Sequence, residues 1–410
     1  MSPAGKCRPF FLLWARGRIW QTSGVIQINK ILRGLFILVL TLLPAALKGE
    51  SLQLTPLTYR VLAEPVQPVL GSDSEYHLVY EISFTNISSQ AWKVERIEAL
   101  NDAGKTLLKL DGAELKSRMG PVSARGGSTE LGPYQSAMAW LDLKVPSKDS
   151  LPQKIHHRFS VGEAGKVLDL AGAEAAVGSG EPPAIGAPLR GADWLAGDGC
   201  CDSIRHVRAV LPINGNLYLS QRFAIDWEKL DEEKRIYSGD AKNPESYFCY
   251  GQEILAVADG EVIEMLDGLP NQVPGKLPDG IDLSQADGNH VILKLASGHY
   301  VLYAHMKPGS VRVKRGARVQ AGQVLGQVGN SGNTSEPHLH FQMMDGPSAM
   351  ASNGLPYRIQ SFELLGRAPS TEAFDKAAAN GSPLSILPAK EPGKHRGQLP
   401  MDLSLVRFPD

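Results

Sequence analysis

The first part of the chain alternates apolar and polar side chains in runs that are separated by turn-forming residues. An alternation with a period of two places the apolar side chains on one face of a strand, so each run predicts a half-buried β-strand. Strands of this length with turn clusters between them predict an antiparallel β-sandwich of immunoglobulin-like size between about Ser51 and Val161. The runs are residues 76–84, 92–100, 137–145 and 156–161.

The composition changes after the sandwich. Residues 163–199 are rich in Ala, Gly and Pro and predict a linker, with room for one short helix. Short strands separated by glycine turns resume near Cys200, and two long polar segments, 227–250 and 269–287, interrupt them as loop insertions. The predicted fold class is therefore mostly β, an N-terminal antiparallel β-sandwich followed by a second β-rich domain. The predicted division is a leader at 1–49, the sandwich at 50–162, the linker at 163–199, the second domain at 200–366 and a C-terminal extension at 367–410 with a helix at about 370–379.

An apolar run at 35–43 follows basic residues and precedes small ones. It is too short to cross a bilayer comfortably and has the length of the apolar core of a signal peptide. We therefore expect an exported protein with no stable membrane span after signal cleavage. In an oxidising compartment, Cys200 or Cys201 is expected to form a disulfide with Cys249.

The charges are nearly balanced, because the chain has 42 basic and 43 acidic residues. Such a balance gives no field that would attract nucleic acid, so we expect no nucleic-acid partner. The function has to be inferred from a site.

Candidate chemistry lies in the second domain. His338 and His340 stand one residue apart in an apolar run, and in a strand their side chains would share a face. His305 ends another alternating run, and Asp226 ends a third. Imidazoles and a carboxylate at strand ends are the groups that a zinc hydrolase uses as ligands and proton carriers. Taken alone, the two neighbouring histidines are equally compatible with a half-buried structural strand.

The motifs around these residues occur in a specific order. They are G-Q-E-I-L-A-V-A-D-G-E-V at 251–262, G-N-H-V at 288–291, Y-A-H at 303–305, V-K-R-G-A-R-V-Q-A-G-Q-V-L-G at 313–326 and P-H-L-H-F at 337–341. This order resembles that of the lysostaphin-type (LytM-like) zinc metalloendopeptidases, which cut peptidoglycan cross-links. The resemblance covers about 222–341, less than a third of the chain.

The resemblance implies a duplicated hybrid motif fold with a zinc ion held by Asp226 and His340. It also implies that His305 and His338 are the catalytic pair that polarises water and steadies the oxyanion. The expected partners are peptidoglycan peptides, and the expected location is the periplasm or cell envelope.

The family's first zinc ligand is missing, because Arg222 stands four residues before Asp226 where the family has a histidine. On a continuous strand these two side chains would share a face, so the guanidinium is expected to point at the metal position. It would repel the ion there or pair with Asp226. The residues that could substitute as ligand are His206, which on its own is more typical of a surface histidine, the thiolates of Cys200, Cys201 and Cys249, and the carboxylates of Asp240 and Glu245.

Two functions therefore stay open. The first is an exported zinc metalloendopeptidase acting on peptidoglycan cross-links, which the retention of Asp226, His305, His338 and His340 favours. The second is a catalytically degenerate LytM-like domain that binds cell wall or a murein hydrolase partner and regulates it, which Arg222 favours.

Overall fold

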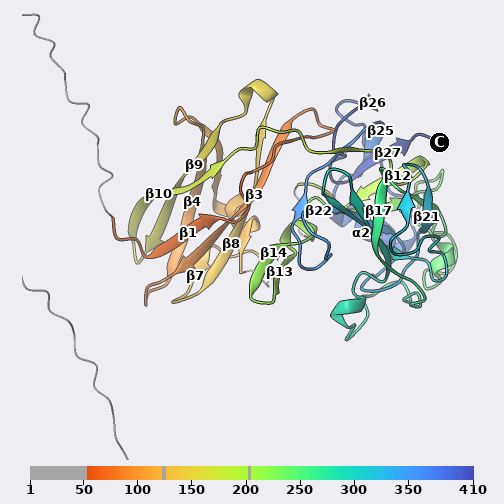
Figure 1. Ribbon diagram of the computed structural model, residues 1–410. Coiled ribbons are helices and arrows are strands. Elements are labelled where there is room, and N and C mark those ends of the chain that lie inside the picture. The colour runs from red at the N-terminus through yellow and green to blue at the C-terminus, as the bar shows by residue number, and fades with distance from the viewer. Residues whose placement is uncertain (1–52, 122–125, 202–204) are drawn as a thin grey trace, which may run out of the picture. The chain divides into compact units, whose positions relative to one another are not determined.

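Strands dominate the part of the chain that the structure, a computed structural model, describes, as the sequence predicted (Figure 1). The described residues are 53–121, 126–201 and 205–410. The predicted leader at 1–49, with its signal peptide, lies outside them. Within them, no helix is both long enough and apolar enough to cross a membrane.

Two antiparallel sheets form the predicted sandwich, with an apolar core of their own. Between the sheets, the rings of Tyr59, Phe84 and Phe159 pack with centroids 4.7 to 6.3 Å apart, a spacing at which aromatic rings attract one another. The first sheet has the order β1 (Leu57–Val61), β3 (Tyr76–Asn86), β8 (Ser136–Val145), β6 (Met119–Gly120), with β2 (Val69–Leu70) beside β3. The second has the order β10 (Lys166–Ala176), β9 (Lys154–Glu163), β4 (Trp92–Leu100), β5 (Thr106–Asp111), with β7 (Glu130–Leu131) beside β4, and the short helix α1 (Gly112–Ser117) follows β5.

The prediction of a linker at 163–199 is wrong. β10 pairs with β9 along most of its length, and β11 (Ala184–Ile185) and β12 (Gly191–Gly197) follow it. β10 lies at the edge of its sheet, so only Leu170 and Ala175 of its side chains are buried, and mostly small or polar residues suffice for the rest. The Ala-, Gly- and Pro-rich composition therefore did not indicate that β10 is a strand.

The second half of the chain is built on one sheet of 11 strands. Its interior is aromatic: Tyr303 packs against Phe341 with ring centroids 5.4 Å apart, and Trp227 packs against Phe408 at 5.1 Å. The strand order is β20 (Arg318–Val319), β17 (Gly260–Leu266), β18 (Asn289–Leu295), β19 (Tyr300–Met306), β22 (Leu339–Met344), β15 (Ile225–Lys229), β12, β27 (Ser404–Phe408), β25 (Phe362–Arg367), β26 (Gly393–His395), with β23 (Gly354–Leu355) beside β22.

Three strands of this sheet come from outside the predicted second domain: β12, β26 and β27. β12, from the predicted linker, lies between β15 and β27, and β26 and β27 come from the predicted C-terminal extension. Trp194 and Leu195 of β12 are fully buried, which explains why the sheet needs this strand. The boundaries that the sequence gives for the domains remain a prediction, but residues on both sides of 200–366 contribute to the same sheet.

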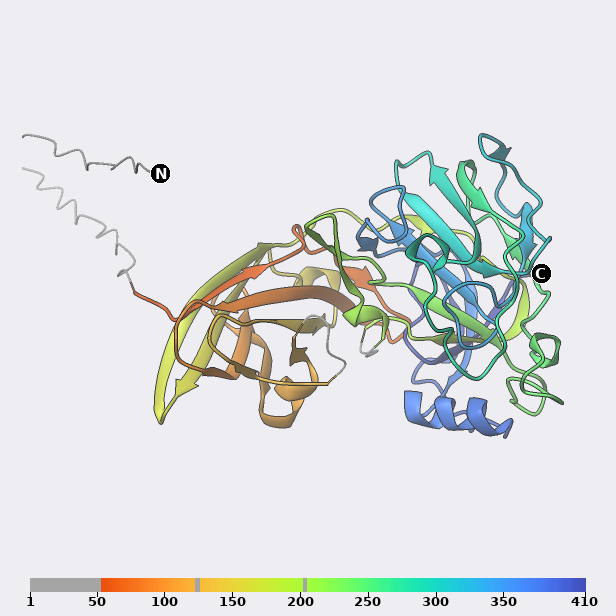
Figure 2. The same cartoon turned by 90° about the horizontal axis from the view of Figure 1, so that it is seen from below.

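The remaining elements are short. The predicted helix is α2 (Thr371–Asn380), visible below the sheet in Figure 2; the Ser370 hydroxyl caps it by accepting from the amide of Ala373, and Gly381 ends it in the left-handed region at φ 63°. Residues 227–229 of the first predicted insertion continue β15; the rest of that insertion and all of the second are loops whose only helical turns are 3₁₀, at Pro244–Ser246 and Leu283–Gln285. The small sheets pair β13 (Val210–Ile213) with β14 (Asn216–Leu219), β16 (Glu253–Leu255) with β21 (Val324–Gln327) and β11 with β24 (Arg358–Ile359), and further 3₁₀ turns lie at Lys148–Ser150 and His206–Arg208.

The cysteines do not pair as expected. Cys200 and Cys201 are joined to each other, so the predicted bridge to Cys249 is wrong. Cys249 is free and buried, and its thiol donates to the carbonyl oxygen of Pro337 at 2.9 Å. Among the described residues, no other cysteine remains to pair with it.

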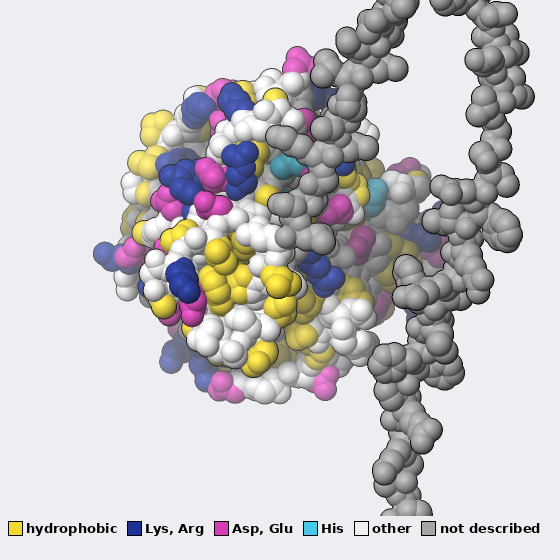
Figure 3. All heavy atoms as spheres, turned by 90° about the vertical axis from the view of Figure 1, so that its left-hand side faces the viewer, with side chains coloured by type: hydrophobic (Ala, Val, Ile, Leu, Met, Phe, Trp, Pro, Cys, Tyr) yellow, Lys and Arg dark blue, Asp and Glu magenta, His cyan; other side chains and the backbone are white. Residues whose placement is uncertain are grey.

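The surface of the sandwich carries both signs of charge. Figure 3 shows basic and acidic side chains interspersed with apolar ones on one face of the molecule. The large apolar side chains that the sandwich exposes are Leu54, Ile87, Tyr134 and Val167.

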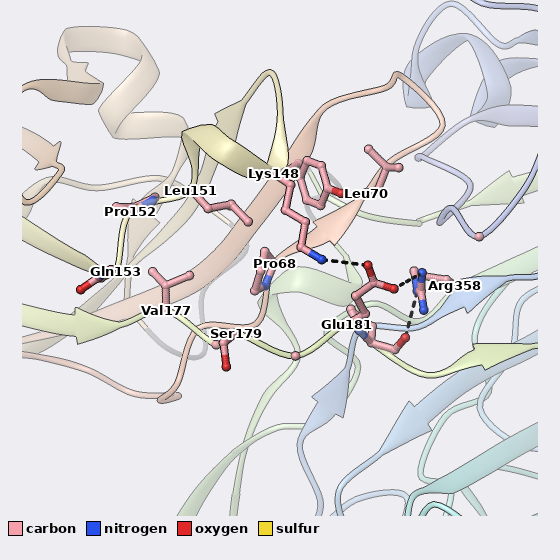
Figure 4. A pocket seen from close by; sticks show the side chains of 15 residues that line it. Pro68, Leu70, Lys148, Leu151, Pro152, Gln153, Val177, Ser179, Glu181 and Arg358 are labelled. Carbon is pink, nitrogen blue, oxygen red and sulfur yellow. Dashed lines mark hydrogen bonds and ion pairs between the residues drawn. The ribbon is translucent and has the colours of Figure 1, made fainter.

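A hollow of about 260 Å³ opens beside the chain that follows β10 (Figure 4). Much of its wall is apolar, with Leu151 and Val177 among the lining residues. Glu181 receives two ion pairs there, from Lys148 at 3.0 Å and from Arg358 of β24 at 2.8 Å. These charges tie the sandwich to a strand of the second half of the chain.

Candidate metal and catalytic centre

The structure brings together the four residues that the sequence singled out. β15 and β22 are antiparallel neighbours in a register that sets Asp226 opposite His340. His338 lies two residues before His340 and therefore on the same face. His305 is the last but one residue of β19, whose Ala304 is the partner of His340 on the other side. The ligand atoms of the three histidines lie within 4.8 Å of one another.

A fifth residue, His206, joins the site from the 3₁₀ turn between β12 and β13. Its side chain is 9 % exposed, and its Nε2 lies 3.2 Å from Oδ2 of Asp226. Its ring packs edge-on against His340 at 4.9 Å. The interpretation of His206 as a surface histidine is therefore wrong: the polar local sequence concealed a turn that packs against the start of β15. The ligand atoms of His206, Asp226 and His340 also lie within 4.8 Å of one another.

Arg222 does not point at the metal position, contrary to the prediction. Residues 220–223 form a turn and not a strand, with Phe223 in the left-handed region at φ 65°, so the alternation of faces does not reach back to Arg222. Its guanidinium pairs instead with Glu81 of β3 at 3.0 Å and donates to the carbonyl of Gly354. Neither contact involves Asp226.

The other possible substitutes for the missing ligand do not reach the site. Cys200 and Cys201 are oxidised, and Cys249 donates to a backbone carbonyl while burial raises the pKa of its thiol. Asp240 and Glu245 are exposed on the first insertion and belong to none of the close His, Cys, Asp and Glu groups of the described residues. His206 is the substitute that the structure favours.

His305 and His338 hold a fixed ring orientation. Nδ1 of His305 donates to the carbonyl of Ser331 at 2.8 Å, and Nδ1 of His338 donates to the carbonyl of Glu336 at 2.8 Å. Each Nε2 therefore keeps a lone pair, and within the described residues that of His338 has no hydrogen-bond partner. Burial and the neighbouring histidines lower the pKa of His305 well below its usual value, and burial lowers the pKa of His338. Both imidazoles are neutral at pH 7.

The backbone of His305 is also unusual. Its φ of 60° lies in the left-handed region, which non-glycine residues adopt at a cost. The amide of His305 donates to the carbonyl of Asp287 at 3.0 Å, which fixes this conformation.

His340 is held by a residue that sequence reasoning missed. Nε2 of His340 donates to Oε1 of Gln342 at 2.9 Å, so Nδ1 faces Oδ1 of Asp226 at 2.8 Å. A hydrogen bond to the far nitrogen of an imidazole selects the tautomer that can bind metal. The sequence contained a signal for this contact, because Gln342 stands two residues after His340 and therefore lies on the same face of the strand.

The charges of the centre are coupled. Burial would raise the pKa of Asp226, but His206, His338 and His340 outweigh it and hold that pKa well below its usual value. Burial would lower the pKa of His206, but Asp226 and Asp198 raise it to about 9. Without a metal, Asp226 and His206 thus form an ion pair at neutral pH.

The centre lies in a groove of about 950 Å³. Both insertions line it, with Lys242 and Tyr247 from the first and Pro274 and Leu277 from the second. Strand β13 and helix α2 supply other walls. The two segments that the sequence showed as loop insertions therefore border the centre.

Comparison with known proteins identifies this part of the chain. Residues 247–352 match the model of peptidase family M23. The cell division protein DipM of Caulobacter vibrioides is 37% identical over 98 residues, which cover 24% of this chain and 13% of DipM. The glycyl-glycine endopeptidase ALE-1 of Staphylococcus capitis is 32% identical over 109 residues, 27% of this chain and 26% of ALE-1.

The chain thus spans about a quarter or less of the length of these relatives. Among solved structures, the catalytic domain of lysostaphin from Staphylococcus simulans is matched over 40% of this chain and 88% of that domain, with 22% identity and a TM-score of 0.22. The motifs predicted from the sequence and the family match fall on the same strands. Residues 247–352, which include His305, His338 and His340, thus match a domain of peptidase family M23, the LytM-type peptidases.

Proposed function

We propose that the protein is an exported zinc metalloendopeptidase that hydrolyses peptide bonds in peptidoglycan cross-links, with His206 in place of the family's missing ligand. The observation that supports this most is the position of His206, whose Nε2 lies 3.2 Å from Asp226 and whose ring packs on His340. Relatives named as a glycyl-glycine endopeptidase and as peptidoglycan DD-endopeptidases support the substrate class.

The donor set fits a zinc ion. Nδ1 of His206 is 3.3 Å from the carbonyl of Ala224, so Nε2 is the nitrogen that faces Asp226. Two imidazole nitrogens and one carboxylate oxygen leave one position of a tetrahedral site open, the arrangement of catalytic zinc sites. Metal binding would displace the proton that Asp226 and Asp198 hold on His206.

The chain's own residues would carry the proton transfers. A bound zinc ion supplies Lewis-acid chemistry, lowering the pKa of water to ~7 and polarising the peptide carbonyl. His338, with an unpartnered Nε2 that is 3.5 Å from Asp226, is placed to take a proton from the attacking water and to return it to the leaving amine. His305, whose Nδ1 donates to Ser331, keeps an accepting Nε2 and would help orient and polarise the attacking water by accepting a hydrogen bond from it.

The degenerate alternative depends on Arg222. In this alternative the domain would bind cell wall or regulate another hydrolase without metal. The guanidinium of Arg222, however, forms an ion pair with Glu81, and Asp226 forms its ion pair with His206.

Zinc content and hydrolysis of purified peptidoglycan test the proposal together. We expect about one zinc per chain in the wild type and in a His156→Ala control, whose half-exposed histidine lies on the sandwich. We expect little zinc and no released muropeptides from His206→Ala or His340→Ala. Zinc and activity retained in His206→Ala would refute the ligand assignment, and a wild type that binds no zinc would favour the regulatory alternative.

A further inference from the structure

A second cluster of metal-binding side chains lies apart from the catalytic centre. It consists of His77 of β3, Asp142 of β8 and Cys201, which follows β12. All three residues are buried, and their ligand atoms lie within 4.8 Å of one another. Two strands of the sandwich and a segment of the second half of the chain thus supply the donors together.

The donors converge on one imidazole nitrogen. Nδ1 of His77 lies 2.9 Å from Oδ1 of Asp142 and 3.5 Å from Sγ of Cys201. The ligand atoms of a tetrahedral zinc ion are roughly 3.5 Å apart, because the bonds to nitrogen and sulfur are ~2.1 and ~2.3 Å long. The nitrogen and the sulfur already have this spacing, and the carboxylate oxygen would have to move by only about 0.5 Å.

The other nitrogen of His77 has the partner that a zinc-binding histidine usually has. Nε2 of His77 lies 3.1 Å from Oδ1 of Asp73, in the turn before β3. When Nε2 donates to this carboxylate, Nδ1 keeps the lone pair that a metal needs. Lys144 lies 3.8 Å from a carboxylate oxygen of Asp73 and of Asp142. A divalent cation and Lys144 would therefore balance the two carboxylates and a thiolate of Cys201.

In the structure a disulfide occupies the sulfur. Cys200 and Cys201 are bonded to each other, and a sulfur in a disulfide is not a thiolate, the form of cysteine that binds metal. Because the two residues are adjacent, the bond closes no loop of chain and constrains the unfolded state little. A stabilising role therefore explains this disulfide poorly, and a redox role explains it better.

We propose that reduction of the Cys200–Cys201 disulfide opens a second zinc site, whose ligands are the thiolate of Cys201, Nδ1 of His77 and the carboxylate of Asp142. A dithiol is the reductant: it gives two electrons to the S–S bond and two protons to the sulfurs, and itself becomes a disulfide. Zinc then displaces the proton of the Cys201 thiol and the proton between His77 and Asp142. A thiolate among the ligands favours zinc over Mg²⁺ and Ca²⁺. This inference does not depend on the proposed function.

Cobalt substitution tests this site separately from the catalytic centre. A thiolate bound to Co²⁺ gives a charge-transfer absorption band in the near ultraviolet, and the ligands proposed for the catalytic centre include no thiolate. The purified protein is reduced with a phosphine, freed of it and titrated with Co²⁺ without oxygen. We expect the band to saturate at about one thiolate-bound Co²⁺ per chain and to disappear when excess Zn²⁺ is added. The oxidised protein should show no band.

Cys200→Ser and Cys201→Ser form a matched pair of variants. Cys200→Ser cannot form the disulfide and should show the band before any reduction. Cys201→Ser lacks the ligand and should show no band in either state. Asp73→Asn should weaken the Co²⁺ affinity of the reduced protein by about 10- to 100-fold, because the outer hydrogen bond of His77 is weakened.

The comparison of the reduced with the oxidised wild type decides the proposal even where a variant does not fold. The absence of a band in the reduced wild type would overturn it. So would a band of equal strength in the oxidised protein, since metal binding would then not depend on reduction. A band that persists in Cys201→Ser would show that another thiol binds the metal and would refute the ligand assignment.

Discussion

The buried pair of Glu81 and Arg222 gives the sharpest test of what the unexpected arginine does. The two side chains are 0% and 8% exposed, and Nη1 of Arg222 lies 3.0 Å from Oε2 of Glu81. With an effective dielectric constant of ~20, two unit charges at this separation attract by roughly 5 kcal/mol, and desolvation offsets much of that. Removing one partner forfeits the attraction and leaves the desolvation cost of the other.

We therefore expect Arg222→Met to lower the free energy of unfolding by about 3 to 5 kcal/mol. The double variant Glu81→Gln with Arg222→Met should recover most of this loss, because no charge then stays buried. The loss in the single variant should shrink at low pH: burial raises the pKa of Glu81 even with Arg222 present, so the carboxyl can become neutral by binding a proton. Urea unfolding at pH 5 and pH 8 measures both effects.

The matched control is the exposed pair of Arg407 and Glu363, which also lies at 3.0 Å but with side chains 53% and 37% exposed. Arg407→Met should change stability by less than about 1 kcal/mol. The zinc content of Arg222→Met should equal that of the wild type. A small loss of stability together with a gain of zinc would refute our account and show that Arg222 occupies the metal position in solution.

Three further predictions concern other residues. Burial lowers the pKa of His77, but Asp142 and Asp73 outweigh it and raise that pKa from 6.5 to about 9, so the stability gained is complete below pH 6.5 and is lost as pH rises through about 9. The free energy of unfolding, measured by urea titration, should be about 3 kcal/mol lower at pH 10 than at pH 6. An unfolding free energy that does not change between these pH values would contradict this. Gln342→Ala should weaken zinc affinity by about 10- to 100-fold in a chelator competition, because the outer hydrogen bond of His340 is lost. His338→Ala should keep zinc but lower kcat by about 10²- to 10⁴-fold, and unchanged kcat would exclude His338 as the proton carrier.

The sequence predicted the strands of the site well, because their physics is local. A period of two places His338 and His340 on one face, and the run that ends at Asp226 needed only to pair beside them. The sandwich and helix α2 followed from the same kind of pattern. The resemblance to a known family added the order in which the strands meet.

The predictions were wrong where contacts between residues distant in the sequence determine the local structure. The turn that redirects Arg222 depends on Phe223 in the left-handed region, which nothing in R-F-A-I-D announces. β10 consists largely of small or polar residues, and β12 is short. The burial of both strands depends on neighbours far along the chain. His206 appears polar and solvent-exposed in its local sequence, and only the packed structure shows that it faces Asp226.

Metal sites depend on where donor atoms lie and not on the segment that supplies them, so a ligand from another turn can replace the family's histidine. The position of His206 in turn depends on Arg205, which links Asp198 at the end of β12 to Asp375 of α2. Helix α2, from the predicted C-terminal extension, thereby takes part in holding the turn that carries the proposed ligand His206. Asp375→Asn should consequently weaken zinc binding, although the Asp375 carboxylate belongs to neither of the two close groups of histidines at the centre. A zinc affinity equal to that of the wild type would show that the turn holds His206 without the helix.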